Sequence, residues 1–186
     1  MNKHGDAALV EDCLRGDGDA LVVLIERYEK PIYNAAFRML KDPDDARDVT
    51  QTVCLKAMEN LASYDPRYKF YSWVYRIAIN ESLNWIKRRD RAGGRTTDEI
   101  PSPLPGPDLA VDRLEVSDHL QAALAELPTG ERAVIVMKYF LECSYDDIGQ
   151  ILESPSKTVK SRLFTARRHL RDRLAARGLL ASSRSA

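Results

Sequence analysis

Apolar residues recur along most of the chain at the three- and four-residue spacing of an amphipathic helix. Between Asp19 and Leu40 they occupy Leu21, Leu24, Ile25, Tyr28, Ile32, Ala35 and Ala36. Pro31 lacks a backbone donor, so we expect it to kink this helix or to split it in two. The sequence contains neither alternating strand patterns nor internal repeats. It therefore predicts an all-α fold.

Local signals predict the remaining helices. Asp42 followed by Pro43 is typical of a helix start, so we expect a helix from there to about Asn60. After a loop at 64–67, another helix should run from about Phe70 to Arg91. Further helices are expected at about 108–126, 129–141, 144–152 and 156–177.

A Gly- and Pro-rich segment divides the chain into two parts. Residues 93–118 begin with two glycines and hold four of the nine prolines, which prevent a helix where they alternate. We therefore expect two small helical domains at 1–92 and 118–177. A flexible acidic linker at 93–117 joins them, and a mobile tail at 178–186 follows.

Charge is balanced over the chain but not along it. The 186 residues are 44% hydrophobic and carry 28 bases against 28 acids, which at first argues against a nucleic-acid partner. Residues 67–91, however, hold seven bases and two acids, and residues 156–177 hold eight bases and one acid. Residues 93–118 hold two bases and six acids. Each basic run alone is as consistent with a solvated helix face as with a binding surface.

Several classes of protein are excluded by what the sequence lacks. No apolar run approaches the ~18 residues of a membrane span, so no membrane insertion is expected. The three cysteines have no CxxC spacing, which argues against a disulfide framework or a metal site and favours the cytoplasm. We find no Gly-rich phosphate loop and no nucleophile–base signature. We therefore expect no enzyme activity, no catalytic residues and no cofactor.

The C-terminal helices have the pattern of a helix-turn-helix. Ser144 to Asp147 fits a capping box, Pro155 ends the first helix, and Ser156 can cap the second. Such a second helix can enter the major groove of DNA. Its apolar stripe, which should be buried, consists of Val159, Leu163, Ala166, Leu170 and Leu174.

The opposite stripe of that second helix combines cations, hydroxyls and one aromatic ring, which suit phosphates and base edges. It consists of Lys157, Lys160, Ser161, Phe164, Thr165, Arg168 and Arg171. The alternative is a solvated basic helix with Phe164 packed on a neighbour.

The first domain offers two candidate surfaces. On the helix that begins near Asp42, an exposed leucine among acids and amides is more typical of a protein contact than of a DNA contact. The residues of this face are Asp44, Asp48, Gln51 and Leu55. The spacing of these residues is equally consistent with an ordinary solvent-exposed polar face that happens to include one leucine.

The second surface is the aromatic and basic loop at 64–69 with the helix that follows it. Interleaved rings and cations suit single-stranded DNA, whose bases stack on rings. The loop contains Tyr64, Arg67, Tyr68 and Lys69, and the helix adds Arg76, Asn80, Leu83 and Lys87. The alternative is that most of these aromatics belong to the core, which we favour for Trp73.

Three motifs together carry a family resemblance. They are residues 42–51 (DPDDARDVTQ), residues 70–80 (FYSWVYRIAIN), and residues 158–163 (TVKSRL) followed by Ala166 and Arg167. In this order and at these separations they resemble a bacterial RNA polymerase sigma factor of the extracytoplasmic-function (ECF) group of the sigma-70 family. The resemblance covers roughly residues 18–91 and 118–175.

The resemblance implies partners and roles for the residues above. Core RNA polymerase, through its β′ clamp helices and β subunit, would be a partner, with Asp44, Asp48, Gln51 and Leu55 on the clamp helices. The −10 promoter element would meet Tyr64, Arg67, Tyr68, Lys69, Arg76, Asn80, Lys87 and Arg88, and the loop would hold a base flipped from the duplex. The −35 element would meet Lys157, Lys160, Ser161, Arg162, Phe164, Thr165 and Arg168. An anti-sigma factor is the implied regulator, and the acidic linker would thread the polymerase channels.

Four positions depart from the family pattern. Ile79 and Thr165 stand where Arg is common, Asn84 stands where Asp is frequent, and Glu153 stands at the turn position usually held by Gly. A left-handed backbone at Glu153 would carry a conformational cost. The competing hypothesis is a stand-alone helix-turn-helix regulator with an N-terminal sensing or dimerisation domain. That hypothesis predicts duplex binding without polymerase.

Overall fold

The computed structural model describes residues 5–92 and 111–179, apart from the side chains of 111–117. All regular structure in these ranges is helical, which confirms the predicted all-α fold class. The first domain contains α1 (Asp6–Leu14), α2 (Gly18–Leu40), α3 (Pro43–Glu59), the short 3₁₀ helix η1 (Leu61–Ser63) and α4 (Phe70–Arg91). The second contains α5 (Val111–Ala125), α6 (Thr129–Tyr139), α7 (Tyr145–Ile151) and α8 (Ser156–Ala176).

Side-chain caps explain where several helices begin. The carboxylate of Asp42 accepts hydrogen bonds from the backbone N–H groups of Asp44 and Asp45 at 2.8 and 2.9 Å, so α3 starts where the sequence predicts. Asp17 caps α2 in the same way through Asp19 and Ala20. Each cap satisfies amide groups that a helix start leaves unpaired.

The structure corrects two details of the sequence prediction. α2 is one helix that continues through Pro31, so the alternative that Pro31 splits it in two is wrong. Ile32 and Ala35 beside it are buried in the core, and this packing maintains the helix. Ser156 does not cap α8. It lies in the first turn, after the N-cap residue Pro155, and its hydroxyl bonds to Asp146.

The helix predicted at about 108–126 corresponds to α5, which begins at Val111 and so includes the last residues of the linker predicted at 93–117. Residues 93–110 lie outside the described residues, as do residues 180–186 of the predicted tail. The sequence reasoning also missed α1, whose N-cap Gly5 offers no side-chain signal.

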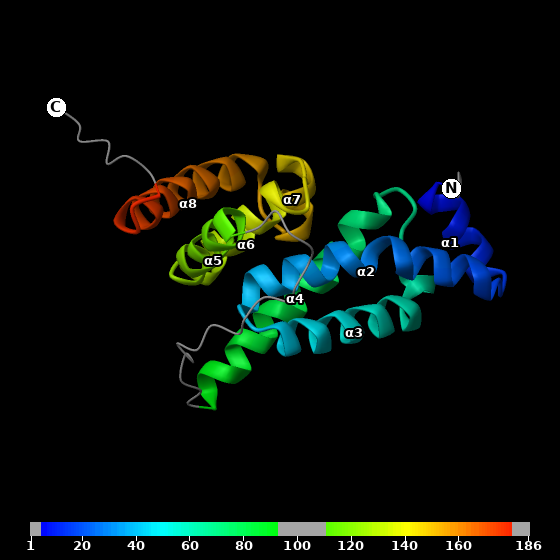
Figure 1. Cartoon of the computed structure of the whole chain (residues 1–186). Helices are drawn as coiled ribbons and strands as arrows, with labels where there is room; N and C mark the ends of the chain where they lie inside the picture. The colour runs from blue at the N-terminus through cyan, green and yellow to red at the C-terminus, as the bar shows by residue number, and fades with distance from the viewer. Residues whose placement is uncertain (1–4, 93–110, 180–186) are drawn as a thin grey trace.

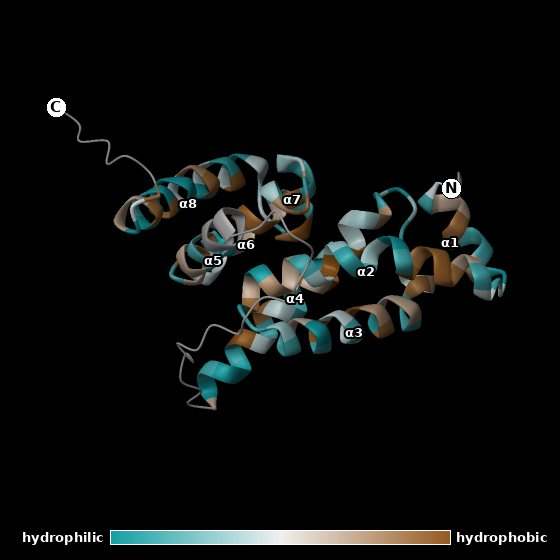
Figure 2. Ribbon diagram, viewed as in Figure 1, coloured by the Kyte–Doolittle hydropathy of each residue, from teal (hydrophilic) through white to brown (hydrophobic). Residues whose placement is uncertain are grey.

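The apolar core forms one cluster that extends through both domains. In the first domain α2, α3 and α4 pack on one another around fully buried Ile32, Met39 and Ile79. In the second, α8 packs on α6 and α7 around Ile135 and Leu163. Hydrophobic and hydrophilic residues alternate along α8 in Figure 2, as expected of an amphipathic helix. None of the described helices combines the length and apolar character needed to cross a membrane.

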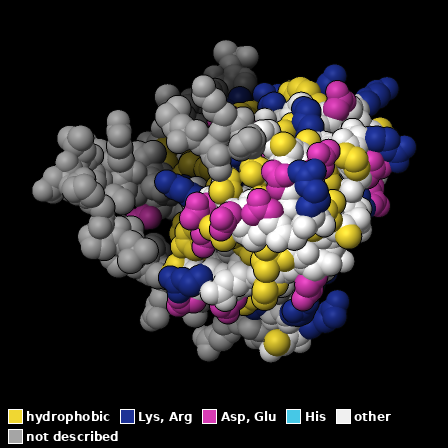
Figure 3. All heavy atoms as spheres, turned by 90° about the vertical axis from the view of Figure 1, so that its right-hand side faces the viewer, with side chains coloured by type: hydrophobic (Ala, Val, Ile, Leu, Met, Phe, Trp, Pro, Cys, Tyr) yellow, Lys and Arg dark blue, Asp and Glu magenta, His cyan; other side chains and the backbone are white. Residues whose placement is uncertain are grey.

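The two domains lie side by side and touch along α2 and α4 (Figure 1). α5 and α6 contact α2, and α7 contacts α4. The remote end of the first domain, where α1 lies, faces the viewer in Figure 3. Acidic, basic and apolar side chains are interspersed there.

Candidate nucleic-acid interfaces

The helix-turn-helix is closed by a reciprocal cap and a tight turn. The Ser144 hydroxyl accepts the N–H of Asp147 at 3.1 Å, and the Asp147 carboxylate accepts the N–H of Ser144 at 2.9 Å, which confirms the predicted capping box. The chain then folds back so that the N–H of Ser154 donates to the carbonyl of Gly149 at 2.8 Å. Glu153 in this turn has a left-handed φ of 50°, the conformation for which a cost is expected from the sequence.

Glycine is required inside α7 by this turn. A Cβ on Gly149 would lie 2.8 Å from the carbonyl oxygen of Ser154, closer than such atoms approach. The absence of a side chain therefore fixes how near α8 comes to α7.

The inner stripe of α8 is buried as predicted over its first half. Val159, Leu163 and Ala166 are almost inaccessible, whereas Leu170 and Leu174 are only partly buried near the C-terminus. On the outer face Phe164 is 62% exposed, so the alternative that it packs on a neighbour is wrong. An exposed aromatic ring among cations is available for a partner.

Six of the seven predicted −35 residues fall into two groups, and Lys160 belongs to neither. One borders an open hollow of 480 Å³ between the starts of α6 and α8, lined by Glu131, Lys157, Thr158, Ser161, Arg162 and Thr165. The other is a hollow of 250 Å³ lined by Phe164, Arg167, Arg168 and Arg171. The −35 set implied by the resemblance omits Arg167 and Arg171, of which Arg171 belongs to the outer stripe predicted from helical spacing.

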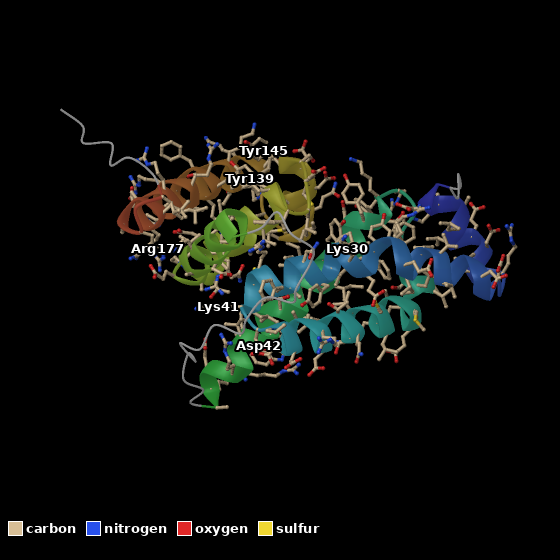
Figure 4. All side chains as sticks on the ribbon, viewed as in Figure 1. Lys30, Lys41, Asp42, Tyr139, Tyr145 and Arg177 are labelled. Carbon is tan, nitrogen blue, oxygen red and sulfur yellow. The ribbon has the colours of Figure 1, made fainter. Side chains whose placement is uncertain are left out.

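Lys160 has a defined position on this surface. Its ammonium lies 5.5 Å from the ring centroid of Tyr145, and that of Lys138 lies 5.0 Å from the same centroid. Figure 4 labels Tyr145 at the α7 end of the second domain. Because a ring face attracts cations, Tyr145 holds the two lysines together, a contact the sequence did not indicate.

In the first domain, the loop before α4 rests on a cluster of aromatic rings in edge-on and tilted contact. Tyr64 packs against Phe70 and Trp73 with centroid separations of 5.4 and 5.7 Å, and its hydroxyl donates to the carbonyl of Tyr68 at 2.5 Å. Phe70 is buried, but Trp73 is only partly covered. The expectation that Trp73 is a core residue is therefore only half correct.

This loop borders a groove of 440 Å³ that is open to solvent. Its lining comprises Ser63, Tyr64, Asp65, Tyr68, Ser72, Trp73 and Arg76, together with Gln150 and Ile151 of the second domain. Three of the predicted −10 residues thus meet in one groove. Arg67 is nearby and exposed, but its guanidinium pairs with Asp65 at 2.5 Å.

The predicted −10 residues of α4 are all exposed but do not share one face. Arg76, Asn80 and Lys87 follow a single stripe, whereas Arg88 is rotated away by the 100° step per residue. Ile79, one of the four positions that depart from the expected family pattern, is fully buried. Its side chain belongs to the core and has no access to DNA.

The polymerase face predicted on α3 exists as one exposed stripe. Asp44, Asp48, Gln51 and Leu55 are all exposed, and Leu55 is 56% accessible. Met58, 41% accessible and three residues beyond Leu55, extends this apolar spot and was missed from the sequence.

Asp45 lies beside the stripe, in the first turn of α3. Burial raises the pKa of Asp45 to about 6, and the nearby charge of Asp42 adds to the effect. Ionisation of Asp45 is therefore less favourable in the folded protein than in water.

The described part of the chain contains no group of three or more His, Cys, Asp or Glu side chains that could hold a metal ion. The fold and its exposed cations instead define a helix-turn-helix DNA-binding protein with a second helical domain.

Comparison with known proteins shows which family of DNA-binding proteins the chain is similar to. The sigma-70 region 2 family matches residues 24–92, and the sigma-70 region 4 family matches residues 117–170. The chain is 35% identical to the ECF RNA polymerase sigma factor SigW of Bacillus subtilis over 89% of its own length and 94% of that protein.

Two solved structures share the fold. The complex of CnrH with the cytosolic domain of CnrY matches with a TM-score of 0.73 at 26% identity, covering 92% of this chain and 97% of CnrH. The sigma factor RpoE of Bartonella quintana, in complex with the anti-sigma factor NepR, matches with a TM-score of 0.66 at 22% identity, covering 83% and 94%.

The chain belongs to the ECF group of the sigma-70 family, which confirms the resemblance drawn from its motifs. It is therefore an RNA polymerase sigma factor, a transcription initiation factor. The competing hypothesis of a stand-alone regulator fails because region 2 and region 4 occur together, in order, on the two domains.

Proposed function

We propose that this sigma factor binds core RNA polymerase through α3, reads the −10 element with α4 and its preceding loop, and reads the −35 element with α8. The observation that carries the proposal is that each matched region coincides with a domain whose exposed face holds the predicted residues. It catalyses no reaction itself and works in the cytoplasm, where bacterial polymerase transcribes.

The −10 role rests on the groove beside Tyr64 and Tyr68. Its partly covered rings and the nearby Arg76 supply stacking surfaces and a cation, the combination that single-stranded DNA requires. A base extruded from the duplex would enter this groove, and its capture would assist promoter melting.

The −35 role rests on the exposed face of α8. Lys157, Lys160, Ser161, Arg162, Phe164, Thr165 and Arg168 cover that face, and the turn at Gly149 sets its angle to α7. Cations there would bind phosphates, and Phe164 could contact thymine methyl groups.

An anti-sigma factor is the proposed regulator. Support comes from the likeness in fold to RpoE, which was solved bound to the anti-sigma factor NepR. We propose that such a protein would compete with polymerase for the α3 stripe.

Transcription in vitro tests the function. Core polymerase plus the purified chain should initiate from fragments selected from a genomic library, and neither component alone should do so. No promoter-specific initiation in the presence of core polymerase would reject the proposed roles of the three surfaces.

The α3 assignment has a sharper test. Asp48→Arg should reduce affinity for core polymerase by at least tenfold, because it reverses a charge in the middle of an exposed contact stripe. Glu11→Arg makes the same charge change on the exposed surface of α1 and should bind core normally. Equal affinities for the two variants would reject α3 as the polymerase surface.

A further inference from the structure

A carboxylate lies in the wall of the open hollow beside the proposed −35 surface. This hollow of 480 Å³ is lined by Glu131 of α6 and by five residues of α8, namely Lys157, Thr158, Ser161, Arg162 and Thr165. The five residues of α8 carry either a cation or a hydroxyl group, so Glu131 is the acid in this lining. The predicted −35 set does not include Glu131.

Glu131 is held in a defined position by α8. It stands in the first turn of α6, its side chain is 15% exposed, and its Oε2 atom lies 2.7 Å from Nδ1 of His169. Because a carboxylate only accepts hydrogen bonds, the imidazole N–H is the donor. His169 follows Thr165 by about one helical turn, so it continues the side of α8 that lines the hollow.

The second oxygen of this carboxylate is available. Where side chains are described, in 5–92 and 118–179, Oε1 of Glu131 has no hydrogen bond or ion pair, whereas Oε2 bonds to His169. Glu126 provides a contrast, since both of its oxygens pair with arginines near the end of α8. The bond to His169 thus fixes the Glu131 side chain and leaves an acceptor in the wall of the hollow.

The chemistry of DNA limits what this acceptor can bind. Phosphates repel a carboxylate, so its partner must be a hydrogen-bond donor on a base. In the major groove these donors are the N4 amino group of cytosine and the N6 amino group of adenine. Adenine also presents the acceptor N7 beside its amino group, and a carboxylate would repel it. Cytosine is therefore the better partner, and the guanine opposite it offers acceptors to the cations of the same hollow.

We propose that Glu131 is a specificity-determining residue of the −35 surface. Its free oxygen accepts a hydrogen bond from the N4 amino group of one cytosine, and His169 is the positioning residue that holds the carboxylate. This inference rests on the proposed function of α8.

Selection of promoters by the holoenzyme tests the base preference. Core polymerase with the full-length chain should select, from fragments randomised across the −35 region, a cytosine at one position that depends on Glu131. Glu131→Gln should shift this position toward adenine, because an amide pairs with both N6 and N7 of adenine, and should leave the other positions unchanged. An unchanged preference in this variant would overturn the proposal.

Glu131→Ala and Glu126→Ala form a matched pair. Each removes an acid that bonds to α8 or its C-terminal end, but Glu126 lines neither of the two hollows on the −35 face. Glu131→Ala should accept any base at the selected position, whereas Glu126→Ala should keep the cytosine. Equal selection by the two variants would mean that Glu131 only links α6 to α8.

Deletion of the amino group tests the hydrogen bond itself. When the selected cytosine is replaced by 2-pyrimidinone, which lacks the N4 amino group, the parent holoenzyme should bind about fivefold to thirtyfold more weakly. Glu131→Ala should show almost no loss, and an equal loss in both proteins would refute the bond. His169→Ala should show an intermediate loss, and His169→Asn, which keeps an amide donor near Nδ1, should restore most of it. Full discrimination by His169→Ala would reject its positioning role.

Two further outcomes are distinct. An adenine preference that depends on Glu131 in the parent chain would overturn the choice of cytosine. If the parent holoenzyme selected no −35 sequence, the proposed function of α8 would fail, which differs from a selection that does not depend on Glu131.

Discussion

Replacing Gly149 by alanine tests the geometry of the helix-turn-helix most directly. In a helix interior, alanine is favoured over glycine by about 1 kcal/mol, so propensity alone predicts stabilisation. The structure predicts the opposite, since the new methyl group would lie 2.8 Å from the carbonyl oxygen of Ser154. Backbone on both sides must shift, and overpacking of this kind costs about 1–3 kcal/mol. The difference between these two effects is a net loss of up to about 2 kcal/mol in the free energy of unfolding of the second domain.

The measurement is urea unfolding of the full chain, followed by two signals. Circular dichroism reports on all helices, whereas tryptophan fluorescence reports on the first domain alone, which holds both Trp73 and Trp85. Gly149→Ala should shift the circular dichroism transition to lower urea and should weaken duplex binding by α8.

The matched control is Gly130→Ala in α6. Gly130 is also helical, but a Cβ there would meet nothing within 4 Å, so the variant should be unchanged or stabilised by up to about 1 kcal/mol. If Gly149→Ala proved as stable as Gly130→Ala, the close approach of the turn to α7 would be refuted.

Two further substitutions test local electrostatics. Because the pKa of Asp45 is raised to about 6 in the folded chain, its ionisation opposes folding as pH rises from about 4 to 6. Asp45→Asn should therefore raise the melting temperature at pH 7 and have no effect at pH 4; an equal gain at both values would rule out this cause. Tyr145→Leu should weaken duplex binding by about twofold to fivefold through release of Lys160. Tyr139→Leu, on an exposed tyrosine labelled nearby in Figure 4, should leave binding unchanged, and equal losses would contradict a positioning role for Tyr145.

The helices could be predicted because their signals are local. Asp42 and Ser144 cap helices through amide groups two or three residues away, and the apolar stripe of α8 follows from spacing alone. α1 was not predicted, because it is short and begins after Gly5, which has no capping side chain. Pro31 does not split α2, because burial of the surrounding turn, a tertiary effect, maintains the helix.

The candidate surfaces were predicted in part for the same reason. Exposure of the α3 stripe and of Phe164 follows from helical periodicity. The pairing of Tyr145 with Lys160, and of Asp147 with Tyr71, joins residues whose proximity depends on how whole helices pack. No pattern in the sequence marks those pairs.

The carboxylate of Asp147 has two roles, one within the second domain and one toward the first. This limits which first domain can be combined with this second domain. It caps α7 through Ser144 and, with its remaining hydrogen-bonding capacity, accepts the hydroxyl of Tyr71. Burial alone would raise the pKa of Asp147, but these bonds and the nearby Lys69 hold it below its ordinary value. A chimaera that joined this second domain to the first domain of a relative lacking Tyr71 and Lys69 would keep its helix-turn-helix. It would leave a buried carboxylate short of donors, so the two halves of this protein are not interchangeable modules.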